Sequence, residues 1–397
     1  MRIHWIWYAT LPNVSLKQKL ELLQHFSDPE EIFNTESFAH FPQIPTPIGK
    51  ALENKDLTLA RSVVKGCAEK QVGILTMADT GYPSKLKNIA DPPLVLYYKG
   101  VLPDFEGQPV IGVVGTRKAS AYGMNVARVI SREIAVCGGL VVSGGAGGID
   151  TAALHSANAA GSQTVAVLGC GVNVAYPKTN RELFSQISKN GCLMSEYLPD
   201  SQPKPWQFPE RNRIISGLSN GVMVVEAPAQ SGALITARDA FAQGRDVFAV
   251  PGSVGMPTCE GSNGLIGDIA TAVFCGWDVL KVYASQYPYA VEKREVEKPG
   301  FSRQRLAETV IFPDMPEPAA KKSVDNPTAN AYSDLECNLT PQEEAVLRCL
   351  DLNPIPVDRL IAQTGLPAPE ALRALTALAV KGMVVNHPGR LVSANYR

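Results

Sequence analysis

Four short segments of this sequence combine glycine, basic and aromatic residues at spacings that suit the binding of phosphate groups and bases. The first is GTRKASAYG, which starts at Gly115 and directly follows a β-branched run. A glycine at the end of a strand lets backbone N–H groups approach an anion. Arg117 adds a bidentate phosphate donor, and Ser120 is placed to cap a helix whose N-terminus favours negative charge. The alternative is a structural turn with a solvated arginine.

The second segment, SGGAGGID, has four glycines within five residues. They are Gly144, Gly145, Gly147 and Gly148. Glycine inside a strand or helix costs backbone entropy, so such a cluster indicates a conformation that only glycine adopts. We predict a nest of backbone N–H groups that holds phosphate. Asp150 fits the N-cap of the next helix better than it fits an acid or base.

The third segment, YPKTN, follows the next strand-like run and places Tyr176 close to Lys178. A ring and an ammonium group at one sheet edge offer a base-stacking face and a phosphate contact together. A turn with an exposed lysine is an equally simple explanation of this segment.

The fourth segment is FPERNR, in which Arg211 and Arg213 flank an asparagine after the aromatic residues Trp206 and Phe208. Basic and stacking groups close together suit single-stranded nucleic acid, so we predict phosphate contacts for both arginines and base stacking by Phe208. Either arginine could instead be the buried partner of a glutamate at the end of a neighbouring strand.

Cofactor and catalytic motifs do not match this sequence. The dinucleotide fingerprint G-x-G-x-x-G is not met in register, and G-x-x-x-x-G-K-[ST] does not occur. The five histidines lack metal-ligand spacing, and no G-x-S-x-G or Cys/His nucleophile pattern is present. Glu196 and Glu226 could form a carboxylate pair, but both end strand-like runs and can be structural. We expect a binding protein with no cofactor, no metal and no catalytic residue.

The four segments need a scaffold that brings the ends of several strands together. Between Pro109 and Tyr283, β-branched runs alternate with amphipathic stretches; the runs are VIGVVG, LVVSGG, TVAVLGCG, GVMVVEA and DVFAVPG. This alternation predicts βαβ units and a largely parallel sheet that is buried on both faces. The fold class expected is α/β, Rossmann-like and doubly wound, with ligands at the carboxyl edge of the sheet.

The flanking segments predict smaller domains on either side. We expect a small helical domain over residues 1–78, the Rossmann-like domain over 79–284, a Pro-rich and charged linker over 285–334, and a winged-helix domain over 335–397. The last shows three helical stretches and a hairpin pattern, and Thr340 and Glu343 are placed to form the capping box of its first helix.

Composition limits the kind of protein this is. Of 397 residues 45% are hydrophobic and 19% are charged, as in soluble globular proteins. No apolar run reaches membrane-spanning length and the start is too aromatic for a signal peptide, so we expect a cytoplasmic protein. The 8 scattered cysteines are expected to be reduced. A net charge of −1 means that any nucleic-acid site must be local.

The ordered series of motifs resembles the DNA-processing protein A family (DprA, also called Smf). The motifs are VVGTRKASAYG, VVSGGAGGID, VAVLGCGVNVAYPKTNREL, SEY, FPERNRIISGL, VVEAPAQSGALITARDA, GRDVFAVPG and EGSNGLI. The resemblance is dense from Asp79 to Leu280 and looser in the flanking segments, where the family has a helical domain of SAM or helix-hairpin-helix type and a winged helix.

This resemblance implies a function in DNA recombination. It implies single-stranded-DNA binding, delivery of the RecA recombinase onto that DNA, protection of incoming strands during natural transformation, and homodimerisation through the Rossmann-like domain. It places the DNA-contacting arginine and lysine on Arg117 and Lys178, and a glycine-rich pocket on Gly144 to Gly148.

Two departures from the family pattern stand out. His155 is one position later than the usual histidine, which is about 100° around a helix. The third helix of the winged module has few basic residues, among them Arg373 and Lys381, which favours protein binding over DNA binding there.

Two other functions remain as alternatives. One is a nucleotide hydrolase of the related Rossmann-like group, with Glu226 or Glu196 as acid or base. Its motif P-G-G-x-G-T-x-x-E is missing, and the nearest match begins at Pro251. The other is a ligand-sensing transcription regulator that uses the winged helix.

Overall fold

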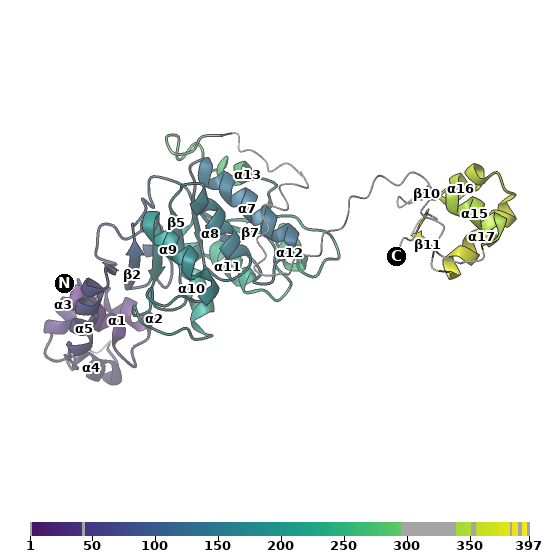
Figure 1. Ribbon diagram of the computed structural model, residues 1–397. Coiled ribbons are helices and arrows are strands. Elements are labelled where there is room, and N and C mark those ends of the chain that lie inside the picture. The colour runs from purple at the N-terminus through teal and green to yellow at the C-terminus, as the bar shows by residue number, and fades with distance from the viewer. Residues whose placement is uncertain are drawn as a thin grey trace. The chain divides into compact units, whose positions relative to one another are not determined.

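The computed structural model describes residues 2–41, 44–294, 339–350, 355–381, 383–387 and 391–394. The chain forms two compact units, Met1–Thr309 and Val310–Arg397 (Figure 1). Most of the predicted linker, from residue 295 onward, lies outside the described residues.

Five helices form the amino-terminal part of the first unit. They are α1 (Arg2–Thr10), α2 (Leu16–Leu22), α3 (Pro29–Asn34), α4 (Thr46–Leu52) and α5 (Thr58–Glu69). Ser15 and Gln18 form a capping box at the start of α2, and the Asp28 side chain caps α3. Trp7 and Tyr8 of α1 are buried in the core that these helices share.

Two antiparallel strands extend the main sheet before its parallel part begins. The strand β1 (Gly73–Thr76) pairs with β2 (Val95–Gly100), and β2 pairs with β6 (Cys192–Ser195); the short helix α6 (Ser84–Lys87) lies between β1 and β2 in the chain. The segment 1–78 therefore contributes a strand to this sheet. The sequence did not reveal it, because a short apolar run such as GILT does not distinguish a strand from a helix.

The parallel part of the sheet has the order β6-β5-β4-β3-β7-β8-β9. Besides β6, its strands are β3 (Val110–Val114), β4 (Leu140–Ser143), β5 (Thr164–Val167), β7 (Gly221–Val224), β8 (Asp246–Ala249) and β9 (Thr271–Ala272). The chain runs outward from β3 to β6 and then returns to β7 on the other side of β3. The loops after β3 and β7 therefore diverge, which makes this the switch point where doubly wound sheets bind ligands.

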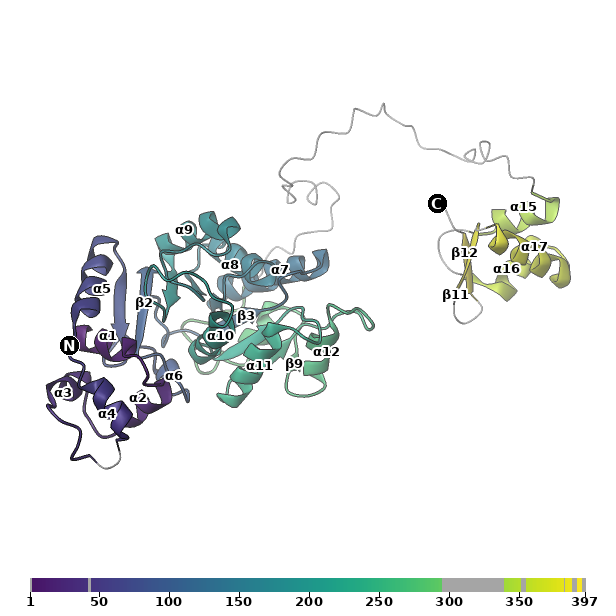
Figure 2. The same cartoon turned by 90° about the horizontal axis from the view of Figure 1, so that it is seen from below.

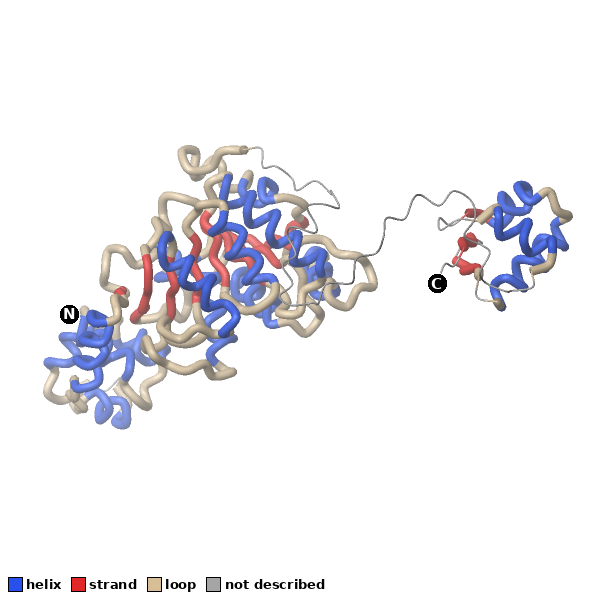
Figure 3. The backbone as a smooth tube through the Cα atoms, viewed as in Figure 1, coloured by secondary structure: helices blue, strands red, loops and turns tan. Residues whose placement is uncertain are grey.

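Helices cover both faces of the sheet (Figures 2 and 3). One face holds α7 (Ala121–Val136), α8 (Ile149–Ala159), α9 (Arg181–Asn190) and α13 (Gly276–Leu280); the other holds α10 (Gln207–Leu218), α11 (Gly232–Ala242) and α12 (Glu260–Ile266). In β3, Ile111 and Val113 pack on the first face, and Val110 and Val114 pack on the second. This burial on two faces explains the continuous β-branched runs and confirms the predicted Rossmann-like α/β fold.

The second unit is a winged helix. Its helices are α15 (Pro341–Arg348), α16 (Val357–Thr364) and α17 (Ala368–Val380), and its antiparallel strands, in spatial order, are β10 (Ile355–Pro356), β12 (Leu391–Ala394) and β11 (Val384–His387). The predicted capping box of Thr340 and Glu343 is present at the start of α15. Lys381, at the end of α17, forms an ion pair with Glu343 at 2.7 Å. The short strand β10 was not predicted.

Candidate nucleic-acid interface

The loops after β3 and β7 are joined at the switch point by Glu226. Its backbone carbonyl accepts the Thr116 N–H at 2.7 Å, and its carboxylate accepts the Ser120 N–H at 2.9 Å. As predicted, Ser120 caps α7, and its hydroxyl accepts the Gly123 N–H at 3.0 Å. Glu226 is only 1% exposed. Its carboxylate thus positions the Gly115 to Ser120 loop, which explains why a strand ends in a buried acid.

The glycine-rich loop after β4 needs glycine at three of its four glycine positions. Gly145 and Gly148 have φ of 66° and 80°, in the left-handed region. A Cβ on Gly148 would collide with the Thr116 carbonyl, and one on Gly144 would collide with the Arg211 guanidinium. Gly147 has no such φ, and a Cβ there would meet no atom within 4 Å. The expected glycine-only conformation therefore applies to the loop but not to Gly147.

Asp150 does not have its predicted position. Helix α8 begins after Gly148, so Asp150 lies inside its first turn and is buried. Its carboxylate accepts the Ala146 N–H at 3.3 Å, which closes the glycine-rich loop on itself. Burial raises the pKa of Asp150 to about 6, against the opposite effect of the nearby Arg211 charge.

Arg211 lies beneath the glycine-rich loop and is only 4% exposed. Its Nη1 donates to the carbonyl of Gly144 at 2.6 Å and also to the carbonyl of Val167. The guanidinium thus ties the loop after β4 to the end of β5 from inside the protein. The predicted direct phosphate contact is not supported, because the side chain has almost no exposed surface.

Arg213 forms a buried salt bridge, which was the alternative to a phosphate contact in the sequence analysis. Its Nη2 lies 2.6 Å from Glu196 Oε2, and its Nε lies 2.9 Å from Asp91 Oδ2. The arginine side chain is 12% exposed. Burial raises the pKa of Glu196, and the guanidinium opposes that shift. A phosphate contact by Arg213 is therefore not supported. Glu196 serves as the buried ion-pair partner of Arg213.

Arg117, Phe208 and Tyr176 form one cluster, which we call the first triad. The guanidinium carbon of Arg117 lies 5.3 Å from the Phe208 ring centroid, and the Phe208 and Tyr176 centroids are 5.4 Å apart. Arg117 is exposed and Tyr176 is 43% exposed. The three residues come from the loop after β3, the loop after β5 and the start of α10. Tertiary structure therefore joins a cation to two rings at one edge, a combination that suits single-stranded nucleic acid.

Lys178 lies at the same edge because its segment is tied to the glycine-rich loop. It begins the short 3₁₀ helix η1 (Lys178–Asn180) and is exposed. The Asn180 amide donates to the Gly145 carbonyl at 3.0 Å and to the Thr151 hydroxyl at 2.7 Å. Asn180 was not singled out in the sequence, although it lies only two residues from the lysine. Its buried amide couples the position of Lys178 to that of the glycine-rich loop.

His155 is exposed on α8. Among the described residues, no group of three or more His, Cys, Asp and Glu could hold a metal ion. In that same part of the chain, no helix has the length and apolar character needed to cross a membrane.

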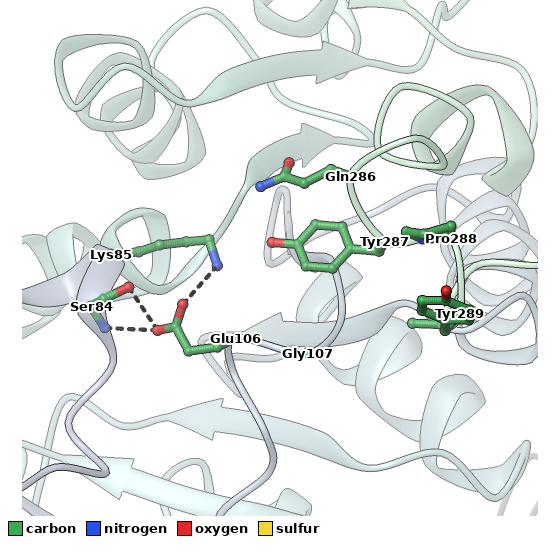
Figure 4. Close-up of a pocket in the computed structure, with 9 residues that line it drawn as sticks. Ser84, Lys85, Glu106, Gly107, Gln286, Tyr287, Pro288 and Tyr289 are labelled. Carbon is green, nitrogen blue, oxygen red and sulfur yellow. Dashed lines mark hydrogen bonds and ion pairs between the residues drawn. The ribbon is translucent and has the colours of Figure 1, made fainter.

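A separate pocket of about 480 Å³ lies at the opposite, amino edge of the sheet (Figure 4). Lys85, Glu106, Tyr287 and the fully exposed Tyr289 contribute to its lining. The Asn220 amide, which directly precedes β7, donates to the Tyr287 hydroxyl at 3.0 Å and so fixes the pocket at this edge. This pocket is therefore separate from the first triad.

The fold and the carboxyl edge together define a class: a Rossmann-like protein with exposed cations and aromatic rings at the carboxyl edge of its sheet, joined to a winged helix. Residues 73–284 match the family model of DNA recombination-mediator protein A, and residues 330–390 match that of the DprA winged helix domain. The chain belongs to the DNA recombination-mediator protein A family, whose members are called DprA or Smf.

Individual members of the family are similar to this chain in sequence. Protein Smf of Synechocystis is 32% identical over 398 residues, which cover 97% of each chain. DNA processing protein DprA of Streptococcus pneumoniae is 44% identical over 209 residues, or 52% of this chain and 72% of that protein.

Solved structures agree with these sequence comparisons. The X-ray structure of Streptococcus pneumoniae DprA superposes with a TM-score of 0.60 at 32% identity, covering 71% of this chain and 98% of that one. DNA processing protein A of Helicobacter pylori, described for its single-stranded-DNA binding mode, gives a TM-score of 0.50 at 28% identity, covering 55% and 97%.

Proposed function

We propose that this protein binds single-stranded DNA across the carboxyl edge of its parallel sheet. Phosphates lie on Arg117 and Lys178 and on the N–H groups of the glycine-rich loop and the Gly115 to Ser120 turn. Bases stack on Tyr176 and Phe208. The observation that carries the proposal is the first triad, an exposed cation and two rings beside a loop in which Gly145 and Gly148 adopt a left-handed φ.

Arg211 and Arg213 have a supporting role in this proposal. Both are held by buried carbonyl or carboxylate groups, so they shape the surface from within and do not touch DNA. Glu196 and Glu226 are held in the same way by Arg213 and Ser120, which gives no support to the hydrolase alternative. The activity that we propose is binding without catalysis.

The decisive experiment compares two double variants that remove the same charge. Arg117→Ala with Lys178→Ala should lower the affinity for a single-stranded oligonucleotide strongly, because both cations face the DNA backbone. Arg132→Ala with Lys189→Ala is the control, since both residues are exposed near the ends of α7 and α9 that lie at the amino edge. Gel shifts with single- and double-stranded oligonucleotides measure the effect. Equal binding by the two double variants would reject the proposal.

We further propose that the bound strand serves recombination. Membership of a family named for mediating DNA recombination supports a role in delivering RecA onto the strand and in protecting incoming DNA during natural transformation, in the cytoplasm. We propose a homodimer formed through the Rossmann-like domain. The RecA role is tested by the rate at which RecA assembles on protein-coated single strands with the chain present or absent, and the dimer by light scattering.

A further inference from the structure

A second group of two rings and a cation lies at the start of α10. Trp206 and Tyr197 have ring centroids 6.0 Å apart at 82°, and Lys204 Nζ lies 5.9 Å from the Trp206 centroid. In the first triad the two ring centroids are 5.4 Å apart, and the Arg117 guanidinium carbon lies 5.3 Å from the Phe208 centroid. We call Tyr197, Trp206 and Lys204 the second triad. The same chemical combination thus occurs twice around one helix end.

The two triads lie at the same edge of the sheet. Tyr197 follows β6 as Tyr176 follows β5, and these two strands are parallel neighbours. Trp206 and Phe208 are two residues apart, which keeps their Cα atoms within about 7 Å. One continuous strand can therefore pass from the first triad to the second.

Buried groups hold the second triad in place. The Lys204 N–H donates to the Gln207 side-chain carbonyl at 2.7 Å, and the Gln207 N–H donates to the Lys204 carbonyl at 3.1 Å. Gln207 is 4% exposed, and its backbone carbonyl accepts the Tyr197 hydroxyl at 3.3 Å. Because the turn is fixed before any ligand arrives, little conformational entropy is lost on binding.

The indole ring is nonetheless open to solvent, with Trp206 53% exposed. An acidic side chain in contact with the triad is Glu210, whose carboxylate accepts the Tyr197 hydroxyl at 3.3 Å. A negative group at that position disfavours a phosphate beside Tyr197, whereas Lys204 attracts one on its own side of the indole. The charges therefore favour a base on Trp206 and its phosphate on Lys204.

We propose that the second triad is a second base-stacking subsite, which extends the single-stranded-DNA track beyond the first triad towards β6. This inference rests on the proposed function of the first triad. Base stacking is tolerant of sequence, because every base presents a π-face, so the subsite sets the length of DNA that is bound and not its sequence.

Tryptophan fluorescence tests the contact directly. The chain has 4 tryptophans; Trp5 and Trp7 are only 6% and 3% exposed, and Trp277 is partly buried in α13. Added oligothymidylate should quench the wild-type emission through Trp206. The Trp206→Phe variant should lose this quenching and keep most of its affinity, because a ring remains. Trp277→Phe is the matched control and should still be quenched.

Affinity gives a second readout. Trp206→Ala should weaken binding of a long oligothymidylate by about 5- to 150-fold, the range that loss of one stacked base produces. The effect should disappear for oligomers too short to reach past the first triad. Tyr289→Ala, at the amino edge, should bind as wild type. Circular dichroism checks that each variant is folded, and Trp206→Phe and Lys204→Gln keep the test valid if Trp206→Ala does not fold.

The outcomes separate the two proposals. If Arg117→Ala with Lys178→Ala loses binding while Trp206→Ala binds long oligomers like wild type, the second triad is rejected and the first stands. Persistent quenching in Trp206→Phe rejects it as well. If the Arg117 and Lys178 double variant also binds normally, the proposed function fails, and this inference fails with it.

Discussion

At the scale of single residues, three arginines from neighbouring segments have different environments. Arg117 is exposed against an aromatic ring, Arg211 donates to backbone carbonyls inside the protein, and Arg213 is paired with Glu196. A guanidinium suits each position because it remains charged and offers several donors. Only the exposed one can exchange its water shell for a phosphate.

We predict that Arg211→Met destabilises the protein by about 3 kcal/mol or more, because the carbonyls of Gly144 and Val167 lose their buried donor. The pKa of Asp150 should rise further without the opposite charge, so the folded state should resist ionisation of this carboxyl up to a higher pH. The stability difference from wild type should therefore widen as the pH rises above about 6. Urea unfolding at several pH values measures both effects.

The matched control for this prediction is Arg117→Met, which makes the same chemical change at an exposed position. It should leave the unfolding free energy within about 0.5 kcal/mol of wild type and weaken DNA binding. A stable Arg211→Met variant that specifically loses DNA binding would restore the direct phosphate contact that the sequence suggested.

At the scale of elements, the glycine-rich loop is shaped by its neighbours as much as by its own backbone. Gly148 packs against the carbonyl of Thr116, and Asn180 reaches the carbonyl of Gly145 from η1. The loops after β3, β4 and β5 are therefore in direct contact with one another. A change in the glycine-rich loop should therefore shift Arg117 on the loop after β3 and Lys178 on the loop after β5.

We predict that Gly148→Ala costs about 1–2 kcal/mol of stability, because an L-residue is strained at φ 80° and its Cβ meets the Thr116 carbonyl. It should also weaken DNA binding by displacing the neighbouring Arg117. Thermal unfolding and anisotropy titrations measure these effects. Gly147→Ala is the control for stability and should not change the unfolding temperature, since a Cβ there has open space. Equal effects of both substitutions would contradict a conformational role for Gly148.

At the scale of the whole molecule, charge is nearly balanced, with a net value of −1. Long-range attraction of the DNA backbone is therefore weak, and binding depends on the cations that touch phosphates. The winged-helix segment 335–397 adds no net positive charge, because its six basic side chains are matched by six acidic ones.

We predict a shallow dependence of single-strand affinity on salt. Two phosphate contacts, by Arg117 and Lys178, give a slope of about −1.4 in a plot of log K against log salt concentration, and Lys204 would make it about −2. In the double variant that lacks Arg117 and Lys178 the slope should fall to near zero, or to about −0.7 if Lys204 also contacts a phosphate. Anisotropy titrations from low to moderate salt measure it. A slope several times steeper in wild type would show that other cations carry the binding.

The domain boundaries are predicted from hydrophobic periodicity and local composition. They divide the chain into 1–78, 79–284, 285–334 and 335–397. The structure adds that β1 lies within the first of these segments and pairs into the large sheet. A boundary drawn from helical periodicity does not detect such a strand, because its partner β2 lies about 20 residues further along the chain.

The sequence by itself determined the features that depend on local chemistry. Strands buried on two faces must be apolar throughout, so the β-branched runs identified the parallel sheet, and Ser120 and Thr340 marked helix starts because caps act within three residues. The glycine-rich loop was visible for a similar reason, since Gly145 and Gly148 adopt a φ that other residues avoid. Only the tertiary structure decided which basic residues face solvent. Arg117 and Arg211 differ in burial because of what strands and helices distant in the chain place around them, and the first triad is assembled from three separate segments of the chain. Exposure and proximity depend on long-range packing, which the order of residues in a short motif does not record.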